Sequence, residues 1–255
     1  MRLPDFIIGG APRSGTTWLY ELLDRHPDVS MAKPLAPEPK FFLRDDEYAK
    51  GLQYYAQKWF AGVDAATMAG EKSTDYLESA EAAARIARDL PHVKLIFILR
   101  EPVSRAYSNY LWSKMNGLET EDFATALRLE DRRERELPER LKFTRPFSYF
   151  SRGLYADLLA PYFSRFARDR MLIPRFEDIV ERPAVLAEAV HRFIGVAPRP
   201  LDAEGLGVIN PSESETDGLA DTVRRDLAAR YAEPNRRLAS LLGPGFPMWT
   251  PAHGL

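Results

Sequence analysis

Short apolar runs alternate with segments of helical spacing along the chain. The longest run, "VKLIFILR" at residues 93–100, is continuous and ends in a charged residue. Such a run is typical of a central parallel strand that is buried on both faces. Residues 6–8 predict another strand, and two extended segments, 69–72 and 171–176, are further candidates.

Apolar residues recur with helical period in most stretches between these strands. The proline at position 102 stands where a helix opens, directly after the longest strand. Strands that alternate with helices indicate the α/β class, with a doubly wound parallel sheet flanked by helices. Because no linker or break in composition divides the chain, we expect a single domain over residues 1–255. The predicted helices are residues 16–25, 46–60, 78–90, 102–115, 183–194 and 221–242, with an amphipathic segment at 153–167.

Three stretches lack this regular pattern. The segment "AKPLAPEPKFFL" after the first helix is rich in proline, which favours ordered, extended turns over helix. Residues 128–145 are a dense charge run, for which we predict a solvated helix or loop. Residues 198–220 are expected to form a loop before the last helix.

The composition narrows the class of protein further. Hydrophobic residues make up 45% of the 255 residues, enough for a packed core. A formal net charge of −2 gives no electrostatic reason to expect nucleic-acid or membrane binding. The absence of cysteine excludes disulfides and thiolate metal sites. The first strand starts too early for a signal peptide and no apolar run is long enough to span a membrane, so we expect a cytoplasmic protein.

The first strand leads through a glycine-rich loop, "FIIGGAPRSGTTWL", into a helix. This arrangement favours anion binding, because backbone N–H groups at a helix N-terminus point at the ligand. Gly10 and Gly15 have the spacing of the nucleotide-triphosphatase loop, G-x-x-x-x-G-K-[ST], but Thr16 occupies the lysine position. Thr16 and Thr17 add hydroxyl donors, and Arg13 adds a cation with several donors. A tight turn without a ligand is the alternative.

A second anion site is predicted in "LREPVSRAYSNY". Arg100 ends the buried strand, and Ser108 lies two turns into the next helix. A buried arginine costs free energy unless an anion or carboxylate pairs with it, and Glu101 is the alternative partner. Both sites follow the carboxyl end of a strand, where ligands of open α/β sheets bind. Together they indicate one ligand that carries two separated phosphate groups.

At these residues the sequence resembles the sulfotransferases that use 3′-phosphoadenosine 5′-phosphosulfate (PAPS). "APRSGTTWL" is similar to their 5′-phosphosulfate loop, and "ILREPVSRAYSNY" is similar to their 3′-phosphate motif. "EPKFF" and "EKSTDY" resemble the carbohydrate-modifying, heparan sulfate branch. The resemblance covers most of the chain. It implies a P-loop-type α/β fold and PAPS as co-substrate, with adenosine 3′,5′-bisphosphate as product and no metal.

The resemblance also implies which residues hold the nucleotide. Trp18 is expected to stack on adenine, with a place in the core as the alternative. Tyr155 is expected to reach the nucleotide, with helix packing as the alternative. The branch has a basic loop before the final helix that covers the nucleotide, whereas residues 210–217 here are acidic. The nucleotide-binding residues implied are Arg13, Ser14, Gly15, Thr16, Thr17, Trp18, Arg100, Ser108 and Tyr155.

Sulfuryl transfer in line needs positioning, charge stabilisation and a base for the acceptor hydroxyl. Glu38 in "EPKFF" matches the base of the carbohydrate branch, with a solvated loop carboxylate as the alternative. Lys72 in "EKSTDY" is implied to neutralise the leaving oxygen, with a surface pair to Glu71 or Asp75 as the alternative. Arg13 is implied to contact the transferred group. The histidines are poorly placed for a base; they are His26, His92, His191 and His253.

The sequence therefore predicts a PAPS-dependent sulfotransferase that acts on a hydroxyl of a sugar, glycoside or natural product. One alternative is a P-loop kinase for small molecules, against which Thr16 and the pair of Arg100 and Ser108 count. The other is a non-catalytic nucleotide-binding relative that has lost the base.

Overall fold

The computed structural model describes residues 1–201 and 218–249. The chain divides into two compact units. The described residues of the first unit are 1–99 and 160–201, and those of the second are 100–159 and 218–249. The single domain expected over residues 1–255 stays a prediction. Among the described residues, no helix has both the length and the apolar character to cross a membrane.

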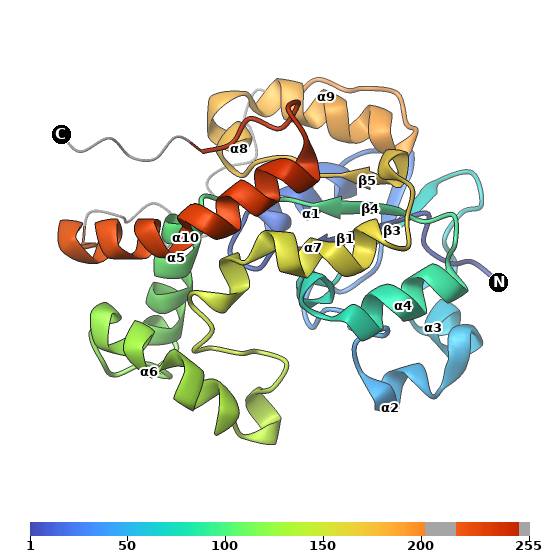
Figure 1. Ribbon diagram of the computed structural model, residues 1–255. Helices are drawn as coiled ribbons and strands as arrows, with labels where there is room; N and C mark the ends of the chain where they lie inside the picture. The colour runs from blue at the N-terminus through green and yellow to red at the C-terminus, as the bar shows by residue number, and fades with distance from the viewer. Residues whose placement is uncertain (202–217, 250–255) are drawn as a thin grey trace. The chain divides into compact units, whose positions relative to one another are not determined.

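A five-stranded parallel sheet forms the centre of the first unit (Figure 1). Strand β1 lies in the middle and pairs with β3 on one side and β4 on the other, so Phe6 faces both Gly70 and Lys94 in register. The prediction of a parallel sheet is confirmed. The strands follow the order β2 (Val29–Met31), β3 (Met68–Lys72), β1 (Phe6–Gly10), β4 (Lys94–Phe97) and β5 (Met171–Leu172).

Helices cover this sheet because the strands bury side chains on both faces. On one face, Phe6 and Ile8 of β1 and Ile96 of β4 pack with apolar side chains of α1 and α9 in one cluster. On the other, Phe97 packs edge-to-face on Tyr162, with ring centroids 4.7 Å apart. The helical elements of this unit are α1 (Thr16–Asp24), α2 (Asp45–Tyr48), α3 (Gly51–Phe60), the 3-10 turn η1 (Thr74–Glu78), α4 (Ala80–Asp89), the 3-10 turn η4 (Arg168–Arg170), α8 (Glu177–Glu181) and α9 (Pro183–Ile194).

The second unit is helical in its described residues, and aromatic side chains dominate its core. Tyr107 and Tyr110 stack on one helix with ring centroids 5.8 Å apart, and Phe123 packs against both. The buried Tyr231 hydroxyl donates a hydrogen bond to the carbonyl of Phe150 at 2.8 Å. The elements are α5 (Pro102–Met115), α6 (Phe123–Arg135), two 3-10 turns, η2 (Glu139–Leu141) and η3 (Ser151–Gly153), and α10 (Asp221–Leu242); α7 (Tyr155–Phe163) begins in this unit and ends in the first.

The structure differs from the prediction in several elements. The helix expected at 46–60 is two helices, because Gly51 adopts φ +81 between α2 and α3. Strand β2 was not predicted, since three residues are too few to show an alternating pattern. Part of the charge run is helix α6, which agrees with the expected helix or loop but begins ahead of the run, at Phe123. The acidic stretch 210–217, which stands where the carbohydrate branch has its basic covering loop, falls outside the described residues.

Candidate active site

The glycine-rich loop joins β1 to α1 with a backbone that requires glycine at position 15. Gly15 is the N-cap of α1 and adopts φ +81, a left-handed conformation that residues with a Cβ rarely take. A Cβ there would lie 2.9 Å from the Phe176 ring and would also meet Ile179. The N-cap residue, Gly15, has no side chain that could cap the helix, and the first turn holds no acidic residue. The amide groups of the first turn and the positive end of the helix dipole therefore favour an anion at this end of α1.

The surroundings of the Ser14 hydroxyl indicate whether the loop suits an anion. Its side chain is fully buried, and its hydroxyl oxygen has no hydrogen-bond partner within residues 1–201 and 218–249. Leaving a buried hydroxyl without a partner costs about 1–3 kcal/mol. An oxyanion cradled by the loop would remove this cost and would meet the amide groups of α1. The residues present thus fit a phosphate or sulfate group.

A largely buried carboxylate and a buried lysine meet beside this loop. Lys72 is the last residue of β3, and its ammonium group forms an ion pair with Glu38 Oε1. The backbone N–H of Thr74 donates to Glu38 Oε2 at 3.1 Å, and its hydroxyl donates to the same oxygen at 3.2 Å. The two charged side chains are only 8% and 13% exposed. The carboxylate of Glu38 is therefore held in place and is not a solvated loop group.

This cluster adjoins the glycine-rich loop within the first unit. The Ser73 N–H donates to the carbonyl of Ile8 in β1 at 3.0 Å. A Cβ on Gly10 would lie 3.2 Å from the carbonyl oxygen of Thr74. Of the alternative partners expected for Lys72, Asp75 forms an ion pair with Lys40. The two predicted catalytic side chains, Glu38 and Lys72, are thus brought together next to the predicted anion loop.

Glu71, the neighbour of Lys72 on β3, faces the interior. It is fully buried, and its Oε2 accepts a hydrogen bond from the Tyr55 hydroxyl at 2.7 Å. Burial, helped by the nearby negative charge of Glu38, raises the pKa of Glu71 to about 7, although the hydroxyl groups of Tyr55 and Tyr76 act in the opposite direction. Sequence reasoning missed this residue. The sequence feature that could have indicated Glu71 is a carboxylate next to an apolar strand segment, where burial of the charged group is costly.

The second predicted anion site lies in the second unit. Arg100 and Ser108 are buried, at 4% and 2% exposure. The Tyr155 hydroxyl donates to the carbonyl of Arg100 at 2.9 Å, so this tyrosine fixes the backbone that carries the arginine. The Glu101 carboxylate, the alternative partner of Arg100, accepts hydrogen bonds from the N–H groups of Val103 and Ser104 and caps α5.

Trp18 lies in the hydrophobic cluster of the first unit and is 5% exposed. This place agrees with the alternative of a core residue, and the contact with adenine stays a prediction. The nucleotide contact expected for Tyr155 likewise stays a prediction.

Within the described part of the chain, none of the contacts of His26, His92 and His191 involves the Glu38 cluster. His26 and His191 are buried with ring centroids 4.8 Å apart, and His26 Nε2 lies 2.9 Å from the carbonyl of Ala197. Burial, with the neighbouring His26, lowers the pKa of His191 to about 4. His92 is exposed, and His253 is outside the described residues. In the part of the chain that is described, no group of three or more His, Cys, Asp or Glu side chains is arranged to hold a metal ion.

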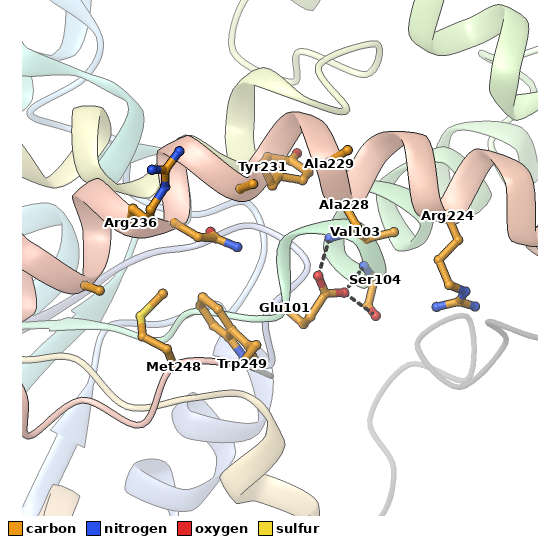
Figure 2. A pocket seen from close by; sticks show the side chains of 13 residues that line it. Glu101, Val103, Ser104, Arg224, Ala228, Ala229, Tyr231, Arg236, Met248 and Trp249 are labelled. Carbon is orange, nitrogen blue, oxygen red and sulfur yellow. Dashed lines mark hydrogen bonds between the residues drawn. The ribbon is translucent and has the colours of Figure 1, made fainter. Parts of the chain in front are cut away.

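A cavity of about 690 Å³ opens in the second unit, where Arg100 leads into α5. Figure 2 shows it between α10 and the segment with Met248 and Trp249, with Glu101 hydrogen-bonded to the start of α5 at its edge. The Trp249 ring lies 6.0 Å from the Tyr155 ring. The polar side chains that line the cavity were not singled out in the sequence analysis. They include Ser104, Arg224, Asn235 and Arg236.

A parallel α/β sheet whose central strand runs through a glycine-rich anion loop into a helix defines a P-loop-type protein. The chain belongs to the sulfotransferase domain family, whose family model matches residues 3–206. The family resemblance expected from the sequence is confirmed.

Heparan sulfate glucosamine 3-O-sulfotransferase 3B1 of Mus musculus is 32% identical over 199 residues, which cover 76% of this chain and 47% of that protein. The chain thus spans about half the length of this relative. The crystal structure of a sulfotransferase from Alicyclobacillus acidocaldarius matches with a TM-score of 0.78 and 27% identity, covering 95% of this chain and 96% of the other. A mouse sulfotransferase complexed with PAP shares the fold, with a TM-score of 0.51 at 18% identity over 78% of this chain and 61% of its own.

Proposed function

We propose that this protein transfers the sulfuryl group of PAPS to a hydroxyl group of a sugar, glycoside or natural product, with Glu38 as general base. The observation that carries the proposal is the pairing of Glu38 with Lys72 beside the glycine-rich loop. Membership of the sulfotransferase family supports the reaction type. The similarity to an enzyme named for the 3-O-sulfation of glucosamine supports a sugar hydroxyl as acceptor.

The loop and the start of α1 are proposed to hold the 5′-phosphosulfate through Ser14, Gly15, Thr16 and Thr17, with Arg13 against the sulfuryl group. Arg100 and Ser108 are proposed to hold the 3′-phosphate, supported by Tyr155, which fixes the backbone of Arg100. The buried hydroxyl of Ser14 and the uncapped start of α1 support the first assignment. PAP in the mouse sulfotransferase supports a nucleotide of this kind.

The reaction divides the work between two side chains. Glu38 accepts the proton of the acceptor hydroxyl. The hydroxyl oxygen of the acceptor attacks sulfur in line with the leaving phosphate oxygen. Lys72 stabilises the charge that develops on that leaving oxygen. An ammonium group carries three donors, so Lys72 can contact the leaving oxygen while one donor stays on Glu38. Thr74 holds the second carboxylate oxygen and fixes the direction in which Glu38 presents its lone pairs.

The substitution Glu38→Gln tests the role of the base, because it keeps the shape and removes the proton acceptor. Turnover with PAPS and a hydroxyl acceptor is expected to fall on the order of 10²- to 10⁴-fold. The affinity for adenosine 3′,5′-bisphosphate, measured by calorimetry, is expected to stay unchanged. A wild-type rate in this variant would show that Glu38 is not the base.

A further inference from the structure

The segment that carries Glu38 is anchored on β3 and η1 by several buried contacts. The Lys40 N–H donates to the Ser73 hydroxyl at 2.9 Å, and the Phe42 N–H donates to the Tyr76 hydroxyl at 3.2 Å. Phe41 and Phe42 are fully buried. Residues 38–42 therefore have a fixed backbone whose position depends on the side chains beneath it.

Tyr55 and Tyr76 lie beneath this segment and are fully buried. The Tyr55 ring stacks on Phe41, with centroids 4.4 Å apart and planes 19° apart. The Tyr76 ring packs edge-to-face on Phe42 with centroids 5.9 Å apart. Each ring thus supports one of the two aromatic residues that follow Glu38 in "EPKFF".

Glu71 orients this aromatic layer from the sheet. Its Oε2 accepts the hydrogen bond of Tyr55 at 2.7 Å, while its Oε1 is buried without a hydrogen-bond partner in the described part of the chain. A leucine at this position would avoid the cost of burying a carboxyl group but would leave the Tyr55 hydroxyl without its acceptor. A carboxyl group that is costly to bury is thus used to fix one phenol ring, and that ring stacks on Phe41.

We propose that Glu71 is a positioning residue for Glu38. Its carboxyl group fixes the Tyr55 ring, the ring supports Phe41, and Phe41 sets the place of the Glu38 carboxylate beside Lys72. This inference rests on the proposed function, in which Glu38 is the base. Misplacement of a catalytic group by about 1 Å can cost on the order of 10²-fold in rate, so loss of the anchor is expected to lower kcat without removing a reacting group.

Conservative variants separate positioning from general stability. Tyr55→Phe removes one hydroxyl, and Glu71→Leu removes the acceptor; each is expected to lower kcat roughly 10-fold or more while KM for PAPS stays unchanged. Glu71→Gln keeps an oxygen acceptor for Tyr55 and is expected to retain most of kcat. Tyr231→Phe is the matched control, since it also removes a hydroxyl hydrogen bond from a fully buried tyrosine but lies in the second unit. Wild-type kcat in Tyr55→Phe and Glu71→Leu, or an equal loss in the control, would overturn the proposal.

Hydrogen exchange provides a readout that does not depend on activity. In Tyr55→Phe and Glu71→Leu, the amide groups of residues 38 and 40–42 are expected to exchange at least several-fold faster, with the exchange of β1 and β4 unchanged. Should Glu71→Leu fail to fold, Tyr55→Phe still gives the answer, because it changes a single oxygen atom. Unchanged exchange of residues 38–42 in a folded variant would contradict the anchoring.

A double-substitution cycle distinguishes a failure of this inference from a failure of the proposed function. If Tyr55 acts through Glu38, adding Tyr55→Phe to Glu38→Gln lowers kcat no further. An additional loss equal to that of Tyr55→Phe alone would show that the anchor acts on something other than Glu38, and would overturn the positioning role. A wild-type rate in Glu38→Gln itself would instead overturn the base, while the exchange experiment would still report on the anchor.

Discussion

Lys72 forms an ion pair with Glu38 across 34 residues of sequence, and the two side chains are only 8% and 13% exposed. One comes from the end of a sheet strand and the other from the proline-rich segment after α1. Burying two charges costs free energy unless they are paired and hydrogen-bonded. The two side chains pair with each other, and Thr74 adds a hydrogen bond to the Glu38 carboxylate. The arrangement places a carboxylate and an ammonium group side by side next to the glycine-rich loop, as the proposed transfer of a sulfuryl group to a hydroxyl requires.

The first prediction concerns Lys72→Ala. Removing the ammonium group takes away the charge proposed to stabilise the leaving oxygen, so kcat is expected to fall on the order of 10²- to 10³-fold. The Kd for adenosine 3′,5′-bisphosphate should change far less. Lys33→Ala is a suitable control, because Lys33 pairs with Asp24 at an exposed position. A variant that binds PAPS more weakly but carries out the chemical step at the normal rate would contradict the role of Lys72.

The second prediction concerns the buried Glu71 and the stability of the fold. Its pKa is raised from 4.5 to about 7, so the folded state holds the proton more tightly than the unfolded state. The free energy of unfolding should therefore decrease as pH rises from about 4.5 to about 7, by on the order of 3 kcal/mol from this group. Urea denaturation of Glu71→Gln should lack this decrease. An identical pH dependence in the two proteins would be evidence against a buried, protonated Glu71.

The third prediction has the opposite sign and concerns His191. Its pKa is lowered from 6.5 to about 4 by burial and by His26. Between these pH values the His191 ring is therefore protonated in the unfolded state and neutral in the folded state. Stability should fall as pH decreases from about 6.5 to about 4. His191→Gln, which cannot become charged, should lose less stability over this range than the wild type. Equal losses in acid denaturation curves would show that the His191 ring is solvated when folded.

The fourth prediction uses two glycines with similar backbone conformations. Gly15 and Gly62 adopt φ +81 and φ +76, but a Cβ on Gly62 would have nothing within 4 Å. Gly62→Ala should therefore cost about 1–2 kcal/mol from backbone strain alone. Gly15→Ala should cost more, because the new Cβ also meets Phe176 and Ile179, and it should weaken nucleotide binding at the loop. Thermal unfolding and calorimetry check both; equal stability losses with unchanged binding in Gly15→Ala would contradict the packing argument.

Much of the fold could be predicted from local pattern. The bounds of α5, α9 and α10 agree with the prediction, since each helix is long and periodic, and a proline opens α5 and α9. The break at Gly51 could not be predicted, because the apolar spacing continues across it and only the backbone conformation interrupts the helix. Strand β2 is defined by its pairing with β3 more than by its own three residues.

The site could be predicted in part. Motif spacing indicated the anion loop, Glu38 and Lys72 one by one, but their ion pair depends on how a proline-rich segment returns to the end of β3. Glu71 was not predicted as functional, because its role arises from Tyr55, which lies on a different element. For Trp18 the sequence left two alternatives open, a contact with adenine and a place in the core; its packing in the hydrophobic cluster agrees with the second, and the contact with adenine stays a prediction.

The most direct test of the account is a calorimetric titration with adenosine 3′,5′-bisphosphate, compared with ADP and with Mg²⁺–ATP. It requires no knowledge of the acceptor. We predict a strong preference for the bisphosphate that is lost in Arg100→Ala, because that arginine is proposed to hold the 3′-phosphate. Equal or tighter binding of Mg²⁺–ATP would contradict the sulfotransferase account and would favour a kinase.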